Sequence, residues 1–486
     1  MNMQYNPEAF IYGANFLNTN WQNQQSDSPN FICLEYAQEY HKFSLTERFE
    51  LGADGLKDLL PKLPNEENKT YKARQDAITL DNMVVRLSQS ATGTIMRKEV
   101  QLTDVPPFLA RILENKVDKE LGLNEFTKKA IYHFIRDAGG WLQCDSPREK
   151  DSDEQPYMQL LPRSKVINWR YNTAGELELA VVYETMITNA GRFGSKTVQR
   201  FRAYEMVEGL CHVTIYEYEA GTAKTTGSSY TIIEEIKTDF TFIPLVELKT
   251  NSNLMYAIAL KNLRQMHFQS LLDRYLTIAA LPQPVFYGAD TDEDEDENID
   301  NKSQKPALIL GVDNALFFDT KDGGFEWAEM SGKSTELIQS HIERLNEDML
   351  QALERSKADQ MKQSNQSATA SHINNKAQQS FLVNISGYTE NAIKRAIEML
   401  GEMVGEKTDK VEFTINKDFT PAVEASNANS LLQAYTAGAL SQETLLISLN
   451  NMELTQIKDI EEEIKKTEAE GIIDEEQNFS KGNSED

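Results

Sequence analysis

Two long helical patterns on either side of a short segment of strand-like residues constrain the fold of this chain most strongly. Residues 254–281 keep apolar side chains over much of the helical circumference, and Pro282 and Pro284 end the pattern. Residues 334–354 have apolar side chains at alternating spacings of four and three, which form a single seam. The seam consists of Ile338, Ile342, Leu345 and Met349. A seam of this width is typical of a helix that packs against another helix, so the sequence predicts a helix pair.

The segment between these helices contains an unusual concentration of carboxylates. Eight of the eleven residues from Asp290 to Asp300 are Asp or Glu, between the strand-like "LPQPVFY" and "PALILGVDNALFF". A cation site, a docking site for a basic partner and a solvated insertion are the three interpretations. A calcium-binding EF-hand loop requires glycine at its sixth position, whereas a loop that starts at Asp290 or Asp292 has Glu295 or Glu297 there. Without that glycine, a solvated and self-repelling loop is favoured.

The rest of the chain alternates between helical and strand periods. Residues 45–87 are predicted to be helical with breaks at Pro61 and Pro64, and a second helical stretch lies at 125–138. Residues 160–250 follow a period of two and predict a mostly antiparallel sheet. A polar break, "KADQMKQSNQSATASHINN", precedes a long helical pattern at 381–404, the strand "VEFTINKDF" and a final helix pair. The charged C-terminal residues predict a frayed helix and then disorder. The fold class expected from this order is α+β with several domains.

Composition excludes some classes of protein. Acidic residues outnumber basic ones by 76 to 49 in 486 residues, so the surface repels nucleic acid on average, and a protein that coats DNA is excluded. Cys33, Cys144 and Cys211 lie far apart and predict reduced thiols. No run is long enough to span a membrane, and the N-terminus has no signal-peptide pattern, so we expect a soluble protein without a membrane partner.

No catalytic or cofactor motif is complete. "SGKST" at 331–335 precedes a helical pattern, but a phosphate-binding loop requires a glycine where this chain has Trp327, so helix capping is favoured. "GRFGSKT" at 191–197 leads into strand residues and predicts a hairpin turn. The six histidines have no metal-ligand spacing, and they are His41, His133, His212, His267, His341 and His372. We therefore expect no enzyme, cofactor or bound metal.

An ordered set of short motifs resembles the portal proteins of tailed bacteriophages. "DLLPKLPNEENKTYKARQ" is similar to the family's Leu-Pro-Lys segment with its following Glu, Tyr and Arg, and "ATGTIMRKEV" to the Gly-x-Ile-x-Arg-Lys element after it. "AGGWLQCDSP", "INWRY" and "FIPLVEL" resemble the turn and strands before the first stem helix. "INKDF" and "GALSQETL" resemble the closing strand and the C-terminal helical unit. These motifs occur in the family's order over roughly residues 45–450.

The resemblance implies a division of the chain into named regions. These are a wing (1–251), a first stem helix (252–281), a β-rich clip (282–333) with an acidic insertion at 289–303, a second stem helix (334–354), a tunnel loop (355–372), a long helix with a wing strand (373–424), and a helical crown with an acidic tail (425–486).

The resemblance also implies a function and partners. It implies a ring, usually of twelve copies, at one vertex of the capsid of a virion assembled in the host cytoplasm. Double-stranded DNA would pass through this ring, and the terminase motor, the tail adaptor and the major capsid protein would bind to it. The tunnel loop would bring Lys357, Gln360, Lys362, Gln363, Asn365 and Gln366 to the DNA. The clip would present Asp290, Asp292, Glu293, Asp294, Glu295, Asp296 and Glu297 to a docking partner.

Two alternative functions remain at this point. One is an acidic cytosolic scaffold or adaptor without a DNA role, which a purified monomer or dimer would favour. The other is a nucleotide-dependent packaging or nucleic-acid enzyme that uses "SGKST", which ATP binding lost in Lys333→Ala would favour.

Overall fold

The computed structural model describes most of the chain between residues 28 and 466. The residues within this range that it leaves undescribed are 116, 119, 147–154, 220–228, 251, 280–282, 288–315, 319–323, 329–332, 363–367, 418, 420–424, 452–454, 456, 458–459 and 461. The chain divides into two compact units, Met1–Lys417 and Asp418–Asp486. The described elements combine helices with antiparallel and mixed sheets, which confirms the predicted α+β class.

The first unit begins with short helices that cover the predicted helical region at 45–87, with the predicted break at Pro61 and Pro64 and a further break at 77–82 that was not predicted. These elements are α1 (Leu34–Arg48), 3-10 turns at Phe49–Gly55 and Lys57–Leu59, α2 (Asn68–Asp76), α3 (Met83–Ile95), α4 (Pro107–Asn115) and α5 (Leu123–Asp137). Pro61 and Pro64 lie between the second 3-10 turn and α2, because proline cannot donate the backbone hydrogen bond that a continuing helix requires. Asn82 caps α3, and its side chain accepts a hydrogen bond from the Val85 N–H.

A three-stranded antiparallel sheet follows α5, with β2 (Gly139–Asp145) between β3 (Tyr157–Leu161) and β9 (Leu245–Lys249). The two glycines that begin β2 allow close approach of other chain segments. A Cβ atom on Gly139 would lie 2.9 Å from the Leu248 carbonyl oxygen and 3.2 Å from Cδ of Arg163. The glycine pair in "AGGWLQ" is therefore required by packing at this strand.

The predicted antiparallel sheet is confirmed as a five-stranded meander. Its strands, in spatial order, are β4 (Val166–Tyr171), β5 (Leu177–Asn189), β6 (Ser195–Val207), β7 (Leu210–Glu219) and β8 (Ser229–Lys237). Every neighbouring pair is antiparallel. The "GRFGSKT" segment forms the turn between β5 and β6, as predicted.

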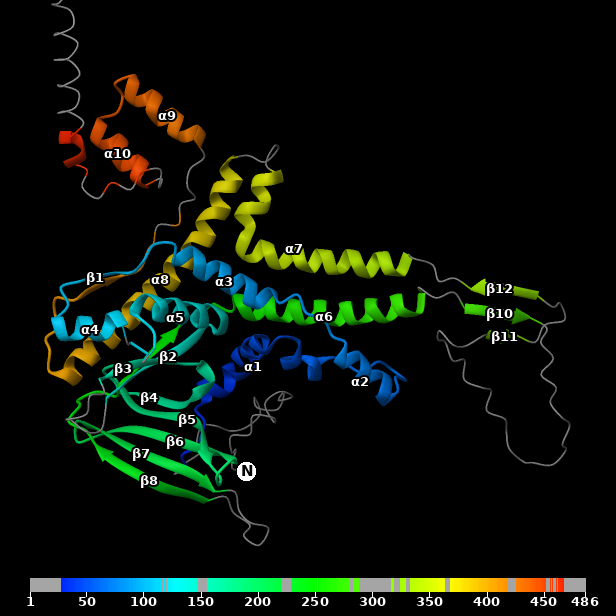
Figure 1. Cartoon of the computed structure of the whole chain (residues 1–486), viewed down its shortest axis with the longest axis horizontal. Coiled ribbons are helices and arrows are strands. Elements are labelled where there is room, and N and C mark those ends of the chain that lie inside the picture. Colours follow the sequence, from blue (N-terminus) through cyan, green and yellow to red (C-terminus); the bar gives the residue numbers. More distant parts are fainter. Residues whose placement is uncertain are drawn as a thin grey trace, which may run out of the picture. The chain divides into compact units, whose positions relative to one another are not determined.

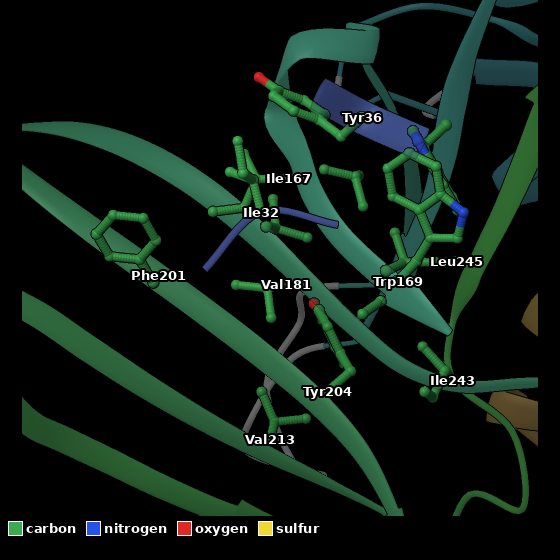
Figure 2. Packing of buried hydrophobic residues seen from close by; sticks show 14 of the residues in the cluster. Ile32, Tyr36, Ile167, Trp169, Val181, Phe201, Tyr204, Val213, Ile243 and Leu245 are labelled. Atoms are coloured by element: carbon green, nitrogen blue, oxygen red, sulfur yellow. The ribbon is translucent and has the colours of Figure 1, made fainter. Parts of the chain in front are cut away.

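The core of this region lies where the five-stranded sheet meets α1 and the chain before it (Figure 2). Trp141 packs against Trp169 with ring centroids 5.4 Å apart. The Tyr36 hydroxyl donates to the Ser164 carbonyl at 3.0 Å, which places the polar end of a buried ring at a backbone acceptor. Apolar burial is therefore the main interaction that fixes α1 on the sheet.

The predicted helix pair is present as α6 (Leu254–Ala279) and α7 (Lys333–Lys362), which lie side by side in Figure 1. Between them the chain forms a three-stranded sheet from β10 (Gln283–Tyr287), β11 (Leu316–Phe318) and β12 (Gly324–Ala328). The central strand β10 is parallel to β11 and antiparallel to β12. Three residues separate α6 from β10, and four separate β12 from α7.

The chain then returns to the body along α8 (Ala368–Val404), which contacts β2, β9 and α5. The Cys144 thiol on β2 donates to the Ala396 carbonyl on α8 at 3.4 Å. Beyond α8, β13 (Glu412–Thr414) pairs antiparallel with β1 (Gln101–Thr103), so residues far apart in sequence form one small sheet. The predicted strand "VEFTINKDF" is shorter than expected, because the register with β1 covers three residues.

The second unit contains α9 (Ala425–Thr436) and α10 (Gln442–Asn451), which contact each other. Gly438 lies in the turn between them with a φ of +73°, a conformation that glycine adopts without strain. After α10, the Asn450 side chain accepts from the Ile457 N–H at 3.0 Å and donates to the Ile457 carbonyl at 2.9 Å. These bonds fix the described part of the chain after α10.

Candidate functional site

The α6–α7 pair is the region that the sequence marks most strongly, and side-chain contacts define its direction. The Lys261 ammonium lies 3.4 Å from the Asp348 carboxylate, and the rings of Phe268 and His341 are 4.6 Å apart. Residue numbers rise along α6 as they fall along α7, so the two helices are antiparallel. The pair therefore carries the chain out from the body and back again.

The seam predicted on α7 is confirmed as its inner face. Ile342, Leu345 and Met349 are buried, and Ile338 is half-buried. The buried apolar residues of α6 are Met255, Ile258, Ala259, Met266 and Leu272. Spacings of four and three residues put the α7 set on one helix face.

Both helices also carry apolar residues that their own chain leaves exposed. Leu260 and Leu276 on α6 keep about 46% and 45% of their surface accessible, and Leu337 on α7 keeps 72%. Single exposed leucines are common on soluble proteins. Here they lie on the same two helices, and they stay exposed although α6 packs against α1, α3 and α5 as well as α7 within the chain. The isolated chain thus presents apolar surface that a neighbouring chain could cover.

A chain of buried amide side chains connects α6 to the body and to α7. Asn262 is fully buried; its Nδ2 donates to the Asp81 carbonyl at 2.8 Å, and its Oδ1 accepts from the Met83 N–H at 2.9 Å. The same Nδ2 donates to Gln265 Oε1, and Gln265 Nε2 donates to Asn346 Oδ1 on α7, both at 2.9 Å. These bonds fix the register of α6 against the start of α3 and against α7 at once.

A second buried polar group, which we call the Glu66 clasp, comprises Glu66, Arg74, Ser270 and Arg274. Both carboxylate oxygens of Glu66 accept from Arg74, at 2.9 and 2.8 Å, and one also accepts from Arg274 on α6 at 3.0 Å. Arg74 further donates to the Ser270 hydroxyl on α6 at 3.2 Å and to the Pro61 carbonyl at 2.7 Å. The clasp joins the proline-broken segment and α2 to the middle of α6.

The Glu66 carboxylate is neutralised within the Glu66 clasp, where it pairs with two guanidinium groups. The Glu66 side chain has no exposed surface, and the hydrogen bonds from Arg74 lower the pKa of its carboxyl to about 2. Tyr71 adds a hydrogen bond from its hydroxyl to the Leu60 carbonyl at 2.7 Å. Glu66, Tyr71 and Arg74 are the Glu, Tyr and Arg of the first motif quoted above, so the structure gives these positions a role in anchoring α6.

The predicted tunnel loop is shorter than expected, which is a correction. α7 continues to Lys362 and α8 begins at Ala368, so Lys357, Gln360 and Lys362 lie in a helix rather than in a loop. The sequence from 357 to 362 contains no proline or glycine, and Lys, Ala, Gln and Met favour helices, which explains the extension. Gln363, Asn365 and Gln366 lie outside the described residues.

The acidic residues predicted for the clip also lie outside the described part of the chain. They are Asp290, Asp292, Glu293, Asp294, Glu295, Asp296 and Glu297. Of the "SGKST" segment, the described part begins at Lys333, the first residue of α7. Among the described residues, no group of three or more His, Cys, Asp or Glu side chains could hold a metal ion. None of the helices in the described part of the chain is long and apolar enough to cross a membrane.

Sequence reasoning missed the buried amides of α6 and the partners of the Glu66 clasp. A signal for the amides was present: Asn262 and Gln265 interrupt an otherwise apolar helical pattern, and a polar residue on the buried side of a helix requires a partner. The identity of those partners depends on the tertiary fold. Asp81, Met83 and Asn346 are far from α6 residues in sequence, and no local pattern points to them.

Comparison with known proteins places these observations beside three findings. The model of a domain of unknown function (DUF4055) matches residues 254–403, which run from the start of α6 almost to the end of α8. No curated protein matches the chain. Two similar solved structures come from the neck of a GTA (gene transfer agent) particle, one empty and one native, each with 13% sequence identity. The match to the empty particle covers 84% of this chain and 93% of the other with a TM-score of 0.37, and that to the native particle covers 76% and 89% with a TM-score of 0.35.

Proposed function

We propose that this chain is a portal subunit, one copy in a ring at a single vertex of a viral capsid through which the genome is packaged and ejected. The observation that carries the proposal is the path of the chain through α6, the β10–β12 sheet and α7. An antiparallel helix pair with a small sheet between its helices is the stem-and-clip arrangement that the sequence resemblance implies. The ordered motifs on both sides of this segment support the same interpretation.

Two further features suit a stem within a ring. The exposed leucines of α6 and α7 offer apolar surface to neighbouring copies, and a contact between unlike surfaces of identical chains closes into a ring when the rotation allows. The amide chain at Asn262 and the Glu66 clasp hold α6 in one register on the body. A stem that positions a channel needs this kind of fixed geometry.

The proposal assigns the partners and the location of the chain. Double-stranded DNA passes through the channel, the terminase and later the tail adaptor bind at the β10–β12 end, and the major capsid protein surrounds the wing. The chain works in the virion after assembly in the host cytoplasm, and it has no catalytic role of its own. Its net charge of −27 suits a channel wall, because DNA that slides should not be held by many phosphate contacts.

The experiment that tests the proposal is imaging of the purified full chain by negative-stain electron microscopy, with particle mass from native mass spectrometry. We expect closed rings with about twelve copies, as the resemblance to the portal family implies. A stable monomer or dimer would instead favour the acidic scaffold.

To test the DNA role, residues 363–367 are shortened, and the genome content of the resulting particles is measured. We expect intact rings and reduced DNA per particle, and normal genome content would contradict a DNA role for this segment.

A further inference from the structure

The β5–β6 hairpin extends beyond the described residues of the neighbouring strands. From Arg200 to Glu205, β6 pairs with both β5 and β7. From Ser195 to Gln199, β6 pairs with β5 residues Thr185–Asn189, and among the described strands it has no second partner there. In the described part of the sheet, the outer half of this hairpin is therefore a two-stranded arm, in which Val198 is buried and the residues on either side of it are exposed.

The end of the arm carries exposed apolar side chains. Phe193 in the turn keeps 90% of its surface accessible, Ile187 on β5 keeps 76%, and Met186 beside it is also exposed. An exposed aromatic ring and exposed aliphatic side chains on one hairpin are typical of an interaction surface, because solvent exposure of such residues has no stabilising role within the chain.

The same arm is basic in an acidic protein. The 20 residues from Thr185 to Tyr204 contain four basic residues and no acidic one. Arg200 and Arg202 are paired within the sheet, at 2.9 Å from Glu217 and 2.9 Å from Glu184. Arg192 and Lys196 are exposed and form no ion pair with any described residue, so their charges are available to a partner.

The turn holds Arg192 and Phe193 in a defined geometry. The Ala190 N–H donates to the Gly194 carbonyl at 2.9 Å, and Gly191 has a φ of +83°. A Cβ atom on Gly194 would lie 2.4 Å from the Ala190 carbonyl oxygen, so this position requires glycine. The Arg192 guanidinium lies over the Phe193 ring, 4.9 Å from its centroid. An ordered tip of this kind loses less conformational entropy on binding.

We propose that the tip of the β5–β6 hairpin docks on a neighbouring copy of this chain, where Phe193 and Ile187 contact an apolar side chain and Arg192 and Lys196 pair with carboxylates. The inference rests on the proposed function in one respect, since it requires that copies assemble. Copies that each carry a net charge of −27 repel one another, so a stable contact between them needs a basic surface on one side.

The chain itself carries surfaces of the complementary kind. Leu51 keeps 69% of its surface exposed and is close in sequence to Glu50 and Asp54, whose side chains are about half and mostly exposed. On α7, the exposed Leu337 follows the exposed Glu336. Glu50 and Asp54 also pair with Arg136 and Lys57, and the second surface has the single carboxylate of Glu336, so each surface combines an exposed leucine with negative charge. A second copy is therefore an occupant that matches the arm in charge and in apolar character.

Site-specific cross-linking tests the contact directly. The photoreactive residue benzoylphenylalanine replaces Phe193 in the full chain, and ¹⁴N-labelled and ¹⁵N-labelled copies are mixed and assembled before irradiation. We expect adducts between light and heavy copies, on peptides that contain Asp or Glu. Adducts confined to one copy, or none in the assembled protein, would overturn this proposal while the ring proposal stands. A chain that stays monomeric would contradict both.

Matched variants test the charges and the ring separately. Arg192→Glu combined with Lys196→Glu should weaken assembly about tenfold or more at low salt, as measured by sedimentation velocity. Lys237→Glu, an exposed lysine at the end of β8, is the charge control and should leave assembly unchanged. Phe193→Ser should weaken assembly, whereas Leu210→Thr at the start of β7, far from the tip of the hairpin, should not. Equal assembly of the arm variants and their controls would overturn the proposal. Arm variants that assemble normally but bind anionic lipid vesicles less than the wild type does would also overturn it, since a lipid surface would then be the partner of the hairpin.

Discussion

The body around the five-stranded sheet and the junction of α6 with its neighbours are held together by different chemistry. In the body, a cluster of aromatic and aliphatic side chains excludes water between α1 and the sheet. At α6, the buried contacts with α2, α3 and α7 include the amide chain at Asn262 and the Glu66 clasp. Both regions are well buried, and the body also has directional bonds, such as that from Tyr36 to Ser164, but at α6 such bonds join α6 to the start of α3 and to α7 in one network.

Apolar packing and buried polar bonds specify different properties of the fold. Apolar packing tolerates changes of shape when volume is kept, so it fixes the presence of a contact more than its register. A buried polar network is stable only when each donor meets its acceptor, so a slip of one helical turn would leave several groups unsatisfied. The junction at α6 is therefore the place where the position of the helix pair on the body is set.

Removal of Arg74 should give the largest effect on stability. Arg74→Met keeps the volume of the side chain but leaves the Glu66 carboxylate buried with Arg274 and a backbone N–H as partners. We expect the free energy of unfolding to fall by about 3 to 5 kcal/mol, the usual cost of breaking a buried ion pair from one side. Urea denaturation followed by circular dichroism measures this change.

Arg274→Met is the matched control for the Glu66 clasp. Arg274 donates one bond to Glu66 and is 37% exposed, so its loss should cost much less than the loss of Arg74. Equal costs for the two variants would show that the clasp does not depend on the buried arginine. Replacement of both charges, Glu66→Leu with Arg74→Met, should recover a large part of the stability.

Loss of the Asn262 amide should have a smaller but still clear effect. Asn262→Leu removes the bonds of this amide to the Met83 N–H, the Asp81 carbonyl and the buried Gln265 side chain, and only the first two groups keep each other as partners, which should cost about 2 to 3 kcal/mol. The control is Ile167→Leu, a shape change at an equally buried position of the apolar core, which should cost less than about 1.5 kcal/mol. A larger loss for Ile167→Leu than for Asn262→Leu would contradict the contrast between the two regions.

The smallest predicted effect concerns pH and the last turn of α1. Burial, and then the nearby Asp137, raises the pKa of Glu47 from its ordinary 4.5 to about 7. Between these values the folded chain keeps a proton that the unfolded chain has lost, so stability should fall as pH rises from about 4.5 to 7. Glu47→Gln removes the titration and should be more stable than the wild type at pH 8, by an amount on the order of 2 kcal/mol.

The measurement is the free energy of unfolding of both proteins between pH 5 and about 8. The Glu66 carboxyl stays ionised throughout this range, because its pKa of about 2 lies below it. The change in stability over this pH range therefore reports the titration of Glu47 and not that of Glu66. Parallel pH profiles for the wild type and Glu47→Gln would show that Glu47 titrates normally.

Much of the body could be predicted from local sequence patterns. The alternation from Leu177 to Lys237 predicted the four long strands, because side chains of a half-buried strand alternate between core and solvent. Likewise, the apolar pattern of α6 and the seam of α7 predicted two packed helices. In each case the signal is the regular spacing of apolar residues, which can be read from the sequence alone.

The polar contacts and one boundary could not be predicted in this way. Glu66 meets Arg274, and Asn262 meets Asp81, across about two hundred residues of sequence, so their pairing follows from the tertiary fold. The end of α7 was misplaced for another reason. The Ser, Lys and Gln residues after Arg355 resemble a linker in composition, yet their intrinsic preferences permit a helix, and the composition alone does not decide between the two.

The parallel pairing of β10 with β11 has a consequence for protein engineering. Parallel neighbours need a connection of about a dozen residues or more, and 28 residues separate these two strands. Removal of Asp290 to Asp300 would leave 17, still enough for the crossover, and the entropy of loop closure changes slowly with length. The acidic stretch thus occupies spare length, and a peptide tag or fluorescent label of similar size could replace it without loss of the strand order.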